Sequence, residues 1–197
     1  MRTTLTAITL AGFLLLAATG CVPSIHPLYT PETLAAEPGL PGVWVSDDGS
    51  ARWDFRPSGT KEYDLRYTER DVKNGAETAA SFSARVVRLG KFRFLDICPV
   101  KLEPGNDLYR ALFIPSHLFL RLEIEGDKLR LAILDGDWLK KELRGGRVAL
   151  AHERIGDERS GREILLTAST RELQRFMLAQ GGNAKAFPEP GDLMRQR

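Results

Sequence analysis

The sequence has little of the side chains that most often carry chemistry. Only two cysteines, Cys21 and Cys98, and three histidines, His26, His117 and His152, occur among its 197 residues. The histidines are widely spaced, with no second histidine or cysteine at metal-ligand spacing, which favours structural roles. No nucleophile elbow, Walker loop, His-Glu-x-x-His or dinucleotide glycine fingerprint is present. The sequence therefore predicts a non-enzyme with no catalytic residue, no cofactor and no metal site.

Two pairs of residues come nearest to a reactive cluster. Asp96 lies two positions from Cys98, and Asp135 two positions from Asp137. A turn followed by a helix cap explains the second pair, and a small buried side chain beside Pro99 explains Cys98. We expect neither pair to be catalytic.

A strong excess of one charge is also missing. The formal net charge is +2, from 28 basic and 26 acidic residues whose signs are interleaved along the chain. Proteins that bind nucleic acid usually cluster basic residues on one face. The composition thus predicts no nucleic-acid partner. If Cys21 carries lipid, Cys98 is the one remaining cysteine. The chain then cannot form an internal disulfide and must be stable on its core alone.

The N-terminus has the pattern of an export signal. Arg2 precedes an apolar run from Leu5 to Thr19, interrupted by few polar residues. As a helix this run of 15 residues would span about 22 Å, less than the roughly 30 Å of a bilayer core. A signal-peptide hydrophobic region fits it better than a membrane span.

The run ends in Ala18-Thr19-Gly20-Cys21, which resembles the lipobox of bacterial lipoproteins. The resemblance implies that residues 1–20 are cleaved and that Cys21 carries lipid, so that the protein is exported and membrane-anchored. Val22 follows where an aspartate would favour the inner membrane, which implies the periplasmic face of the outer membrane. An ordinary cleaved signal, with Cys21 incidental, and an uncleaved anchor are the alternatives.

Residues 21–41 contain five prolines and little apolar periodicity, which predicts a lipidated, extended tether. Its start, Cys-Val-Pro-Ser-Ile-His-Pro-Leu-Tyr-Thr, is similar to the opening of a group of uncharacterised bacterial lipoproteins. That group continues with a Gly-x-Trp and a Trp-Leu-Lys segment, here Gly42-Val43-Trp44 and Trp138-Leu139-Lys140. The likeness implies no activity.

Residues 42–182 read as a single β-rich domain, because apolar and polar residues alternate with period two. The clearest hairpin joins Leu118–Glu125 to Lys128–Leu134 through Gly126-Asp127, which suits a two-residue turn. Further strands are expected at residues 52–56, 62–68, 81–86, 92–97, 108–114, 148–154 and 163–167. The large side chains expected to point inward are Trp44, Trp53, Phe55, Tyr63, Phe82 and Phe94.

Two helices interrupt the strands. Asp137 is the expected cap of a short helix over residues 138–144. Ser169 and Glu172 form a capping box for a second helix, with Leu173, Phe176 and Met177 on its buried face. Residues 183–197, rich in Pro, Gly and charge, are expected to form a disordered tail.

The expected fold is mainly β: an antiparallel barrel or curved sandwich of about eight to ten strands with two short helices. Gly42-Val43-Trp44 resembles the Gly-x-Trp of lipocalins and other calycins, which implies a calycin-like barrel. Three functions stay open: a tethered module that binds an apolar small molecule or lipid, an envelope adaptor that docks another protein, and an enzyme with an unrecognised site. A hollow barrel favours the first and a filled one the second.

Overall fold

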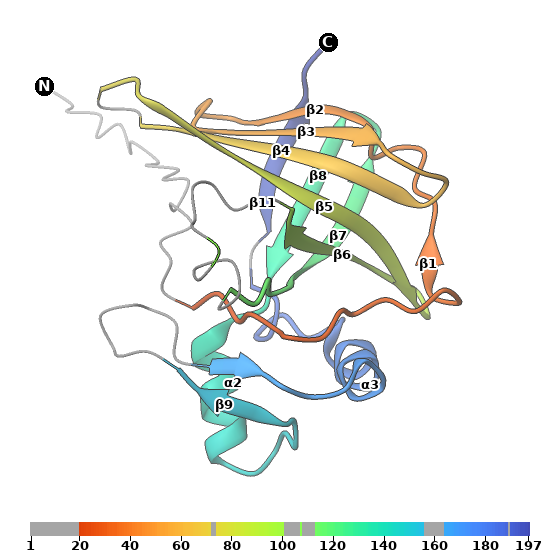
Figure 1. Ribbon diagram of the computed structural model, residues 1–197, viewed down its shortest axis with the longest axis vertical. Coiled ribbons are helices and arrows are strands. Elements are labelled where there is room, and N and C mark those ends of the chain that lie inside the picture. Colours follow the sequence, from red (N-terminus) through yellow and green to blue (C-terminus); the bar gives the residue numbers. More distant parts are fainter. Residues whose placement is uncertain (1–19, 72–73, 101–106, 108–112, 156–163, 189) are drawn as a thin grey trace, which may run out of the picture.

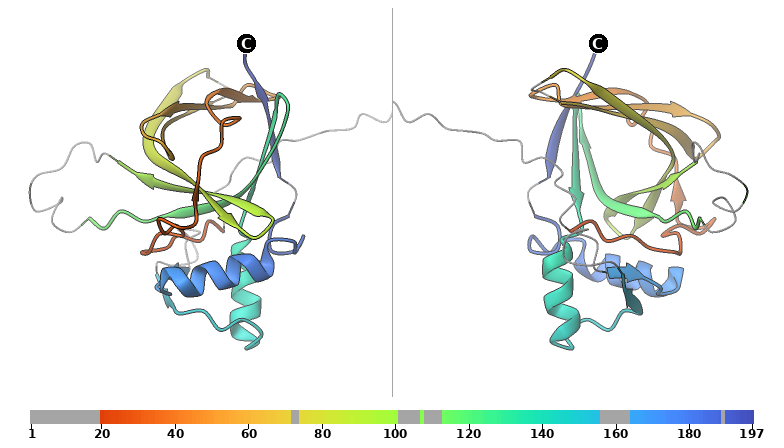
Figure 2. Two further views of the ribbon diagram at one scale, coloured as in Figure 1. Left: turned by 90° about the vertical axis from the view of Figure 1, so that its right-hand side faces the viewer. Right: turned by 60° about the vertical axis from the view of Figure 1, so that its left-hand side comes forward.

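The computed structural model describes residues 20–71, 74–100, 107, 113–155, 164–188 and 190–197. Within these residues the protein is mainly β, with an antiparallel barrel and a smaller layer of helices beside it (Figures 1 and 2). The predicted mainly β fold class is confirmed in its barrel form, and the closed barrel is consistent with the calycin-like expectation.

The barrel is closed by eight described strands. Their order is β5-β4-β3-β2-β11-β8-β7-β6, and β6 pairs with β5 to complete the ring. A short ninth strand, β1 (Leu34–Ala35), adds to β5 beyond the end of β4. The barrel strands are β2 (Gly42–Ser46), β3 (Ala51–Pro57), β4 (Glu62–Arg70), β5 (Glu77–Leu89), β6 (Phe92–Pro99), β7 (Leu118–Glu125), β8 (Lys128–Ile133) and β11 (Gly191–Arg195).

Alternation along each strand produces the barrel core, because successive side chains point to opposite faces. The β7–β8 hairpin confirms the expectation in detail: Glu125 pairs with Lys128, and Gly126 has the positive φ that a two-residue primed turn requires. Buried interior residues come from every barrel strand, and the largest include Trp44, Trp53, Phe55, Tyr63, Leu95, Leu120 and Leu129.

A second core lies outside the barrel, between its wall and the helical layer. That layer contains α2 (Gly136–Arg144), α3 (Thr170–Gln180) and a two-stranded sheet of β9 (His152–Arg154) and β10 (Ile164–Leu166). The capping box of Ser169 and Glu172 begins α3 as predicted, and its buried face is the predicted one. The second core joins outward side chains of the barrel, Val87, Phe94, Phe119 and Ala132, to Leu139, Leu173, Phe176 and Met177.

Two local predictions were wrong, and a third lies largely outside the described residues. Phe94 points outward into the second core, because the period of β6 places its neighbour Leu95 inside the barrel. Asp135, not Asp137, caps α2 by accepting a hydrogen bond from the Trp138 amide at 2.7 Å. The strand expected at residues 108–114 falls largely on residues outside those described, and its last two residues are not strand.

Residues 22–41 and 191–195, near the two ends of the described chain, belong to the folded body, contrary to the sequence prediction. In the expected tether, Val22, Leu28 and Leu40 are almost fully buried. In the expected disordered tail, residues 191–195 form β11, which pairs with β2 and β8 and places Leu193 in the barrel core. Both segments are rich in proline or charge, and their few apolar residues show no periodicity. The sequence pattern therefore gave no sign that these residues are buried.

Candidate anchor site and the polar cluster beside it

Cys21 lies where the chain enters the folded body. Its side chain is partly exposed, whereas the next residue, Val22, is only 3% exposed and belongs to the second core. No disulfide joins Cys21 to Cys98. A lipid on the sulfur of Cys21 would therefore be attached directly to the domain and not through a flexible linker.

Backbone hydrogen bonds secure the segment that follows Cys21. Ser24 and His117 exchange two bonds, of 2.9 and 2.8 Å, so that the segment extends the end of β7. On its other side, the Leu166 amide donates to the Pro23 carbonyl and the Ile25 amide donates to the Leu166 carbonyl. The segment thus bridges the barrel and the β9–β10 sheet.

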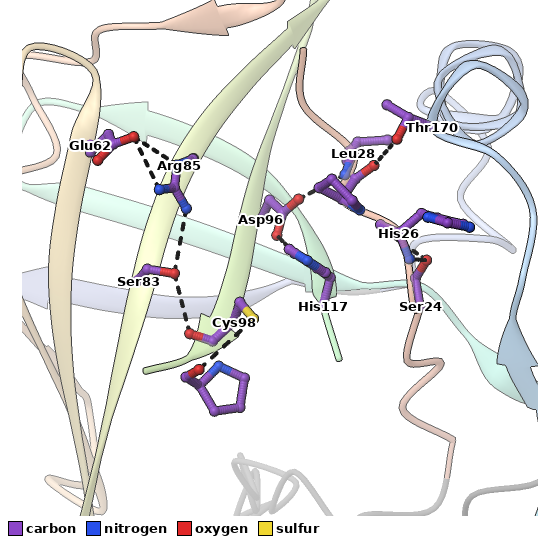
Figure 3. Close-up of polar contacts among 12 residues, drawn as sticks. Ser24, His26, Leu28, Glu62, Ser83, Arg85, Asp96, Cys98, His117 and Thr170 are labelled. Carbon is purple, nitrogen blue, oxygen red and sulfur yellow. Dashed lines mark hydrogen bonds and ion pairs between the residues drawn. The ribbon is translucent and has the colours of Figure 1, made fainter. Parts of the chain in front are cut away.

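A buried carboxylate holds the same segment from the barrel wall (Figure 3). Asp96 points outward from β6, is 2% exposed, and accepts a hydrogen bond from the Leu28 amide at 2.7 Å. Its other oxygen lies 2.7 Å from Nδ1 of His117. A carboxylate can only accept hydrogen bonds, so the imidazole donates this one through Nδ1–H. The other ring nitrogen, Nε2, does not take part in this contact.

Helix α3 and β5 complete the attachment. The Thr170 hydroxyl donates to the Pro27 carbonyl at 2.8 Å, and the Gln174 amide donates to the Leu28 carbonyl at 2.8 Å. On the barrel side, the Arg85 guanidinium lies 4.8 Å from the centre of the Tyr29 ring and pairs with Glu62. These contacts come from elements far apart in the sequence.

The polar cluster around Asp96 and His117 contains an acid–imidazole pair. Among the described residues, no nucleophile is aligned with this pair. Ser24 Oγ donates to the His26 carbonyl, and the Cys98 thiol lies 3.9 Å from the Pro99 carbonyl oxygen. Burial, and then the Asp96 carboxylate, raise the pKa of Cys98, while Arg85 lowers it. A raised pKa keeps the sulfur as a thiol, the weaker nucleophile. The arrangement is suited to fixing the N-terminal segment in place.

The histidines occupy three different settings. His26 is exposed on the N-terminal segment, His117 pairs with Asp96, and His152 Nδ1 lies 2.8 Å from the Leu150 carbonyl oxygen. Sequence reasoning missed the Asp96–His117 pair, because 21 residues separate its members and neither belongs to a local motif. Cys98, expected to be buried, is partly exposed.

The described residues contain no metal cluster and no membrane-spanning helix. No group of three or more His, Cys, Asp or Glu side chains there could hold a metal ion. No helix in that part of the chain has both the length and the apolar character needed to cross a bilayer. Comparison of the chain with protein-family models, curated proteins and solved structures gives no match.

Proposed function

We propose that this protein is a non-catalytic envelope lipoprotein, anchored through Cys21, whose barrel is a rigid scaffold that presents its outer surface to another envelope component. The anchor is inferred from the lipobox resemblance at residues 18–21 and from the position of Cys21 at the start of the folded body. Two or more acyl chains hold a protein on a membrane almost permanently.

The observation that favours a scaffold over a carrier is the burial of the barrel interior. Inward side chains from most of the strands, including Trp44, Phe55, Leu65, Ala84, Leu95, Leu120 and Leu129, are at most 2% exposed. A cavity that admits water leaves accessible surface on the side chains that line it. Dense packing of large side chains such as Trp44 and Phe55 supports a filled barrel of the kind that eight strands readily form.

A second candidate, binding of an apolar small molecule, is favoured by one local feature. Tyr67, Phe82 and Leu118 pack on the barrel core but keep partial exposure. Partly exposed apolar side chains at this end of the barrel would suit contact with a lipid or another apolar ligand.

The anchor is tested by metabolic labelling with an alkyne fatty acid. We expect label on the wild type and on Cys98→Ser, and none on Cys21→Ser. Equal label on Cys21→Ser and wild type would reject the anchor. Native mass spectrometry of the delipidated protein separates the two roles: the scaffold requires the bare polypeptide mass, and a stoichiometric co-purifying small molecule would establish the second candidate instead.

A further inference from the structure

A basic pocket opens between α2 and the β9–β10 sheet. Its volume is about 140 Å³, and two apolar residues, Leu143 and Ile164, form part of its wall. The remaining lining residues are all cationic or capable of becoming so: Lys140, Arg144, His152 and Arg154. Among the residues that the structure describes, no acidic side chain lines the pocket; Lys140 pairs with Asp137, which lies outside the lining. The two arginines therefore give the pocket a positive charge that favours an anion.

The two arginines are available for a ligand. Arg144 and Arg154 are exposed, and within the part of the chain that the structure describes neither forms an ion pair. Glu153 lies between His152 and Arg154 on β9, and the alternation of a strand directs it to the other face. Guanidinium groups donate in a fork that matches the oxygens of a phosphate.

The pocket lies close to the proposed point of lipid attachment. In the uncleaved chain, a side chain at Gly136 would collide with the backbone of Gly20, so the first turn of α2 lies beside the proposed cleavage point before Cys21. Arg144 is eight positions further along this helix, which is about 12 Å at 1.5 Å per residue. On the other wall, Leu166 of β10 pairs with His152 and hydrogen-bonds to the segment that follows Cys21. Figure 1 shows α2 and β9 together on the side of the molecule away from β3 and β4.

We propose that this pocket binds the phosphate of an anionic phospholipid headgroup in the membrane that holds Cys21. The inference rests on the proposed anchor, because a lipidated Cys21 would keep the pocket within reach of the headgroup layer. Basic residues near an anionic surface each contribute a few-fold to binding. The apolar wall of Leu143 and Ile164 suits the glycerol part of such a headgroup better than a free inorganic ion.

The test uses residues 21–197 with Cys21→Ser, a chain without lipid that contains every described helix and strand. Flotation is measured with vesicles of phosphatidylcholine alone and of phosphatidylcholine with phosphatidylglycerol. We expect binding to the anionic vesicles only, and a loss of roughly tenfold in affinity for Arg144→Gln/Arg154→Gln. The matched control is Arg66→Gln/Arg70→Gln, which removes the same charge from exposed positions on β4.

Two results would overturn the pocket. Equal losses in the two double variants would mean that only net charge matters, and absence of binding to anionic vesicles would reject the lipid. Direct titration with inorganic phosphate distinguishes the source of the ligand: phosphate binding that Arg144→Gln/Arg154→Gln weakens, without any binding to anionic vesicles, would assign the pocket to a free anion. Since labelling of Cys21 is measured separately, failure here leaves the anchor standing, and failure of the anchor is visible without the vesicles.

Discussion

The guanidinium of Arg195 lies over the ring of Trp44, with its central carbon 4.1 Å from the ring centre. Its two terminal nitrogens donate to the carbonyls of Pro41 and Gly39 at 2.7 and 2.6 Å. Arg195 is the last residue of β11 and Trp44 lies in β2. The contact therefore joins the last barrel strand in the sequence to the first. Gly42 has φ +127°, and a Cβ there would lie 2.6 Å from Arg195, which explains the glycine of Gly42-Val43-Trp44.

Replacing this guanidinium should therefore destabilise the barrel. We expect Arg195→Ala to lower the free energy of unfolding by about 2–3 kcal/mol, since it removes two charge-assisted hydrogen bonds and a cation–π contact. Arg195→Lys should lose less, because an ammonium keeps the charge but cannot reach both carbonyls in a planar fork. Urea unfolding followed by tryptophan fluorescence measures both, and equal stability of Arg195→Ala and wild type would contradict the role.

Removal of residues 190–197 should open the barrel. This deletion leaves the edges of β2 and β8 without their partner and takes Leu193 out of the core. Unpaired strand edges expose backbone groups that promote association. We expect loss of cooperative unfolding and aggregation on gel filtration. A deletion variant that stays monomeric and unfolds at the wild-type urea concentration would show that β11 does not close the barrel.

Asp96 should contribute more to the free energy of unfolding than a single ion pair does. Asp96→Ala leaves the Leu28 amide and the His117 imidazole without their acceptor, and each lost partner costs about 1–3 kcal/mol. Asp96→Asn keeps an acceptor for Leu28 and should cost less. Hydrogen exchange at the Leu28 amide should accelerate in the alanine variant. Asp64→Ala, at an exposed position on β4, is the control and should change stability by less than about 0.5 kcal/mol.

Helix α3 offers a comparison between a cap and a core residue. Ser169→Ala removes the cap and should cost about 1 kcal/mol. Phe176, which is 9% exposed, packs in the second core, so Phe176→Ala should cost about 3–5 kcal/mol. Urea unfolding would measure the two. A loss below about 1 kcal/mol for Phe176→Ala would mean that α3 is not firmly packed on the barrel.

The Cys98 thiol should react slowly with alkylating reagents. Burial and Asp96 raise its pKa, so a smaller fraction is thiolate at neutral pH than in a free cysteine. In the Cys21→Ser protein, where Cys98 is the one thiol, iodoacetamide labelling should accelerate as the pH rises beyond the pKa of an ordinary cysteine. Arg85→Gln should slow the reaction further, because Arg85 opposes the shift. A rate equal to that of free cysteine at pH 7.5 would contradict the raised pKa.

Local patterns in the sequence were sufficient to predict most of the strands and both helices that the structure describes in full. The β7–β8 hairpin follows from alternating leucines around Gly126-Asp127, and α3 follows from the capping box and one apolar stripe. Each signal lies within about a dozen residues and acts through the backbone of its own segment. For that reason the mainly β fold, as a barrel or a curved sandwich, could be predicted without tertiary information.

Closure of the barrel, by contrast, was decided only in three dimensions. Residues 191–195 and the segment around Leu28 have no periodicity of their own, and they are ordered by partners contributed by distant strands. The Asp96–His117 pair and the basic pocket arise in the same way, from residues that the topology brings together. A short segment without a pattern gains its structure from the surface that it covers. The sequence alone could therefore predict an anchor at Cys21 and most of the strands, but not the way in which the two ends of the described chain complete the body.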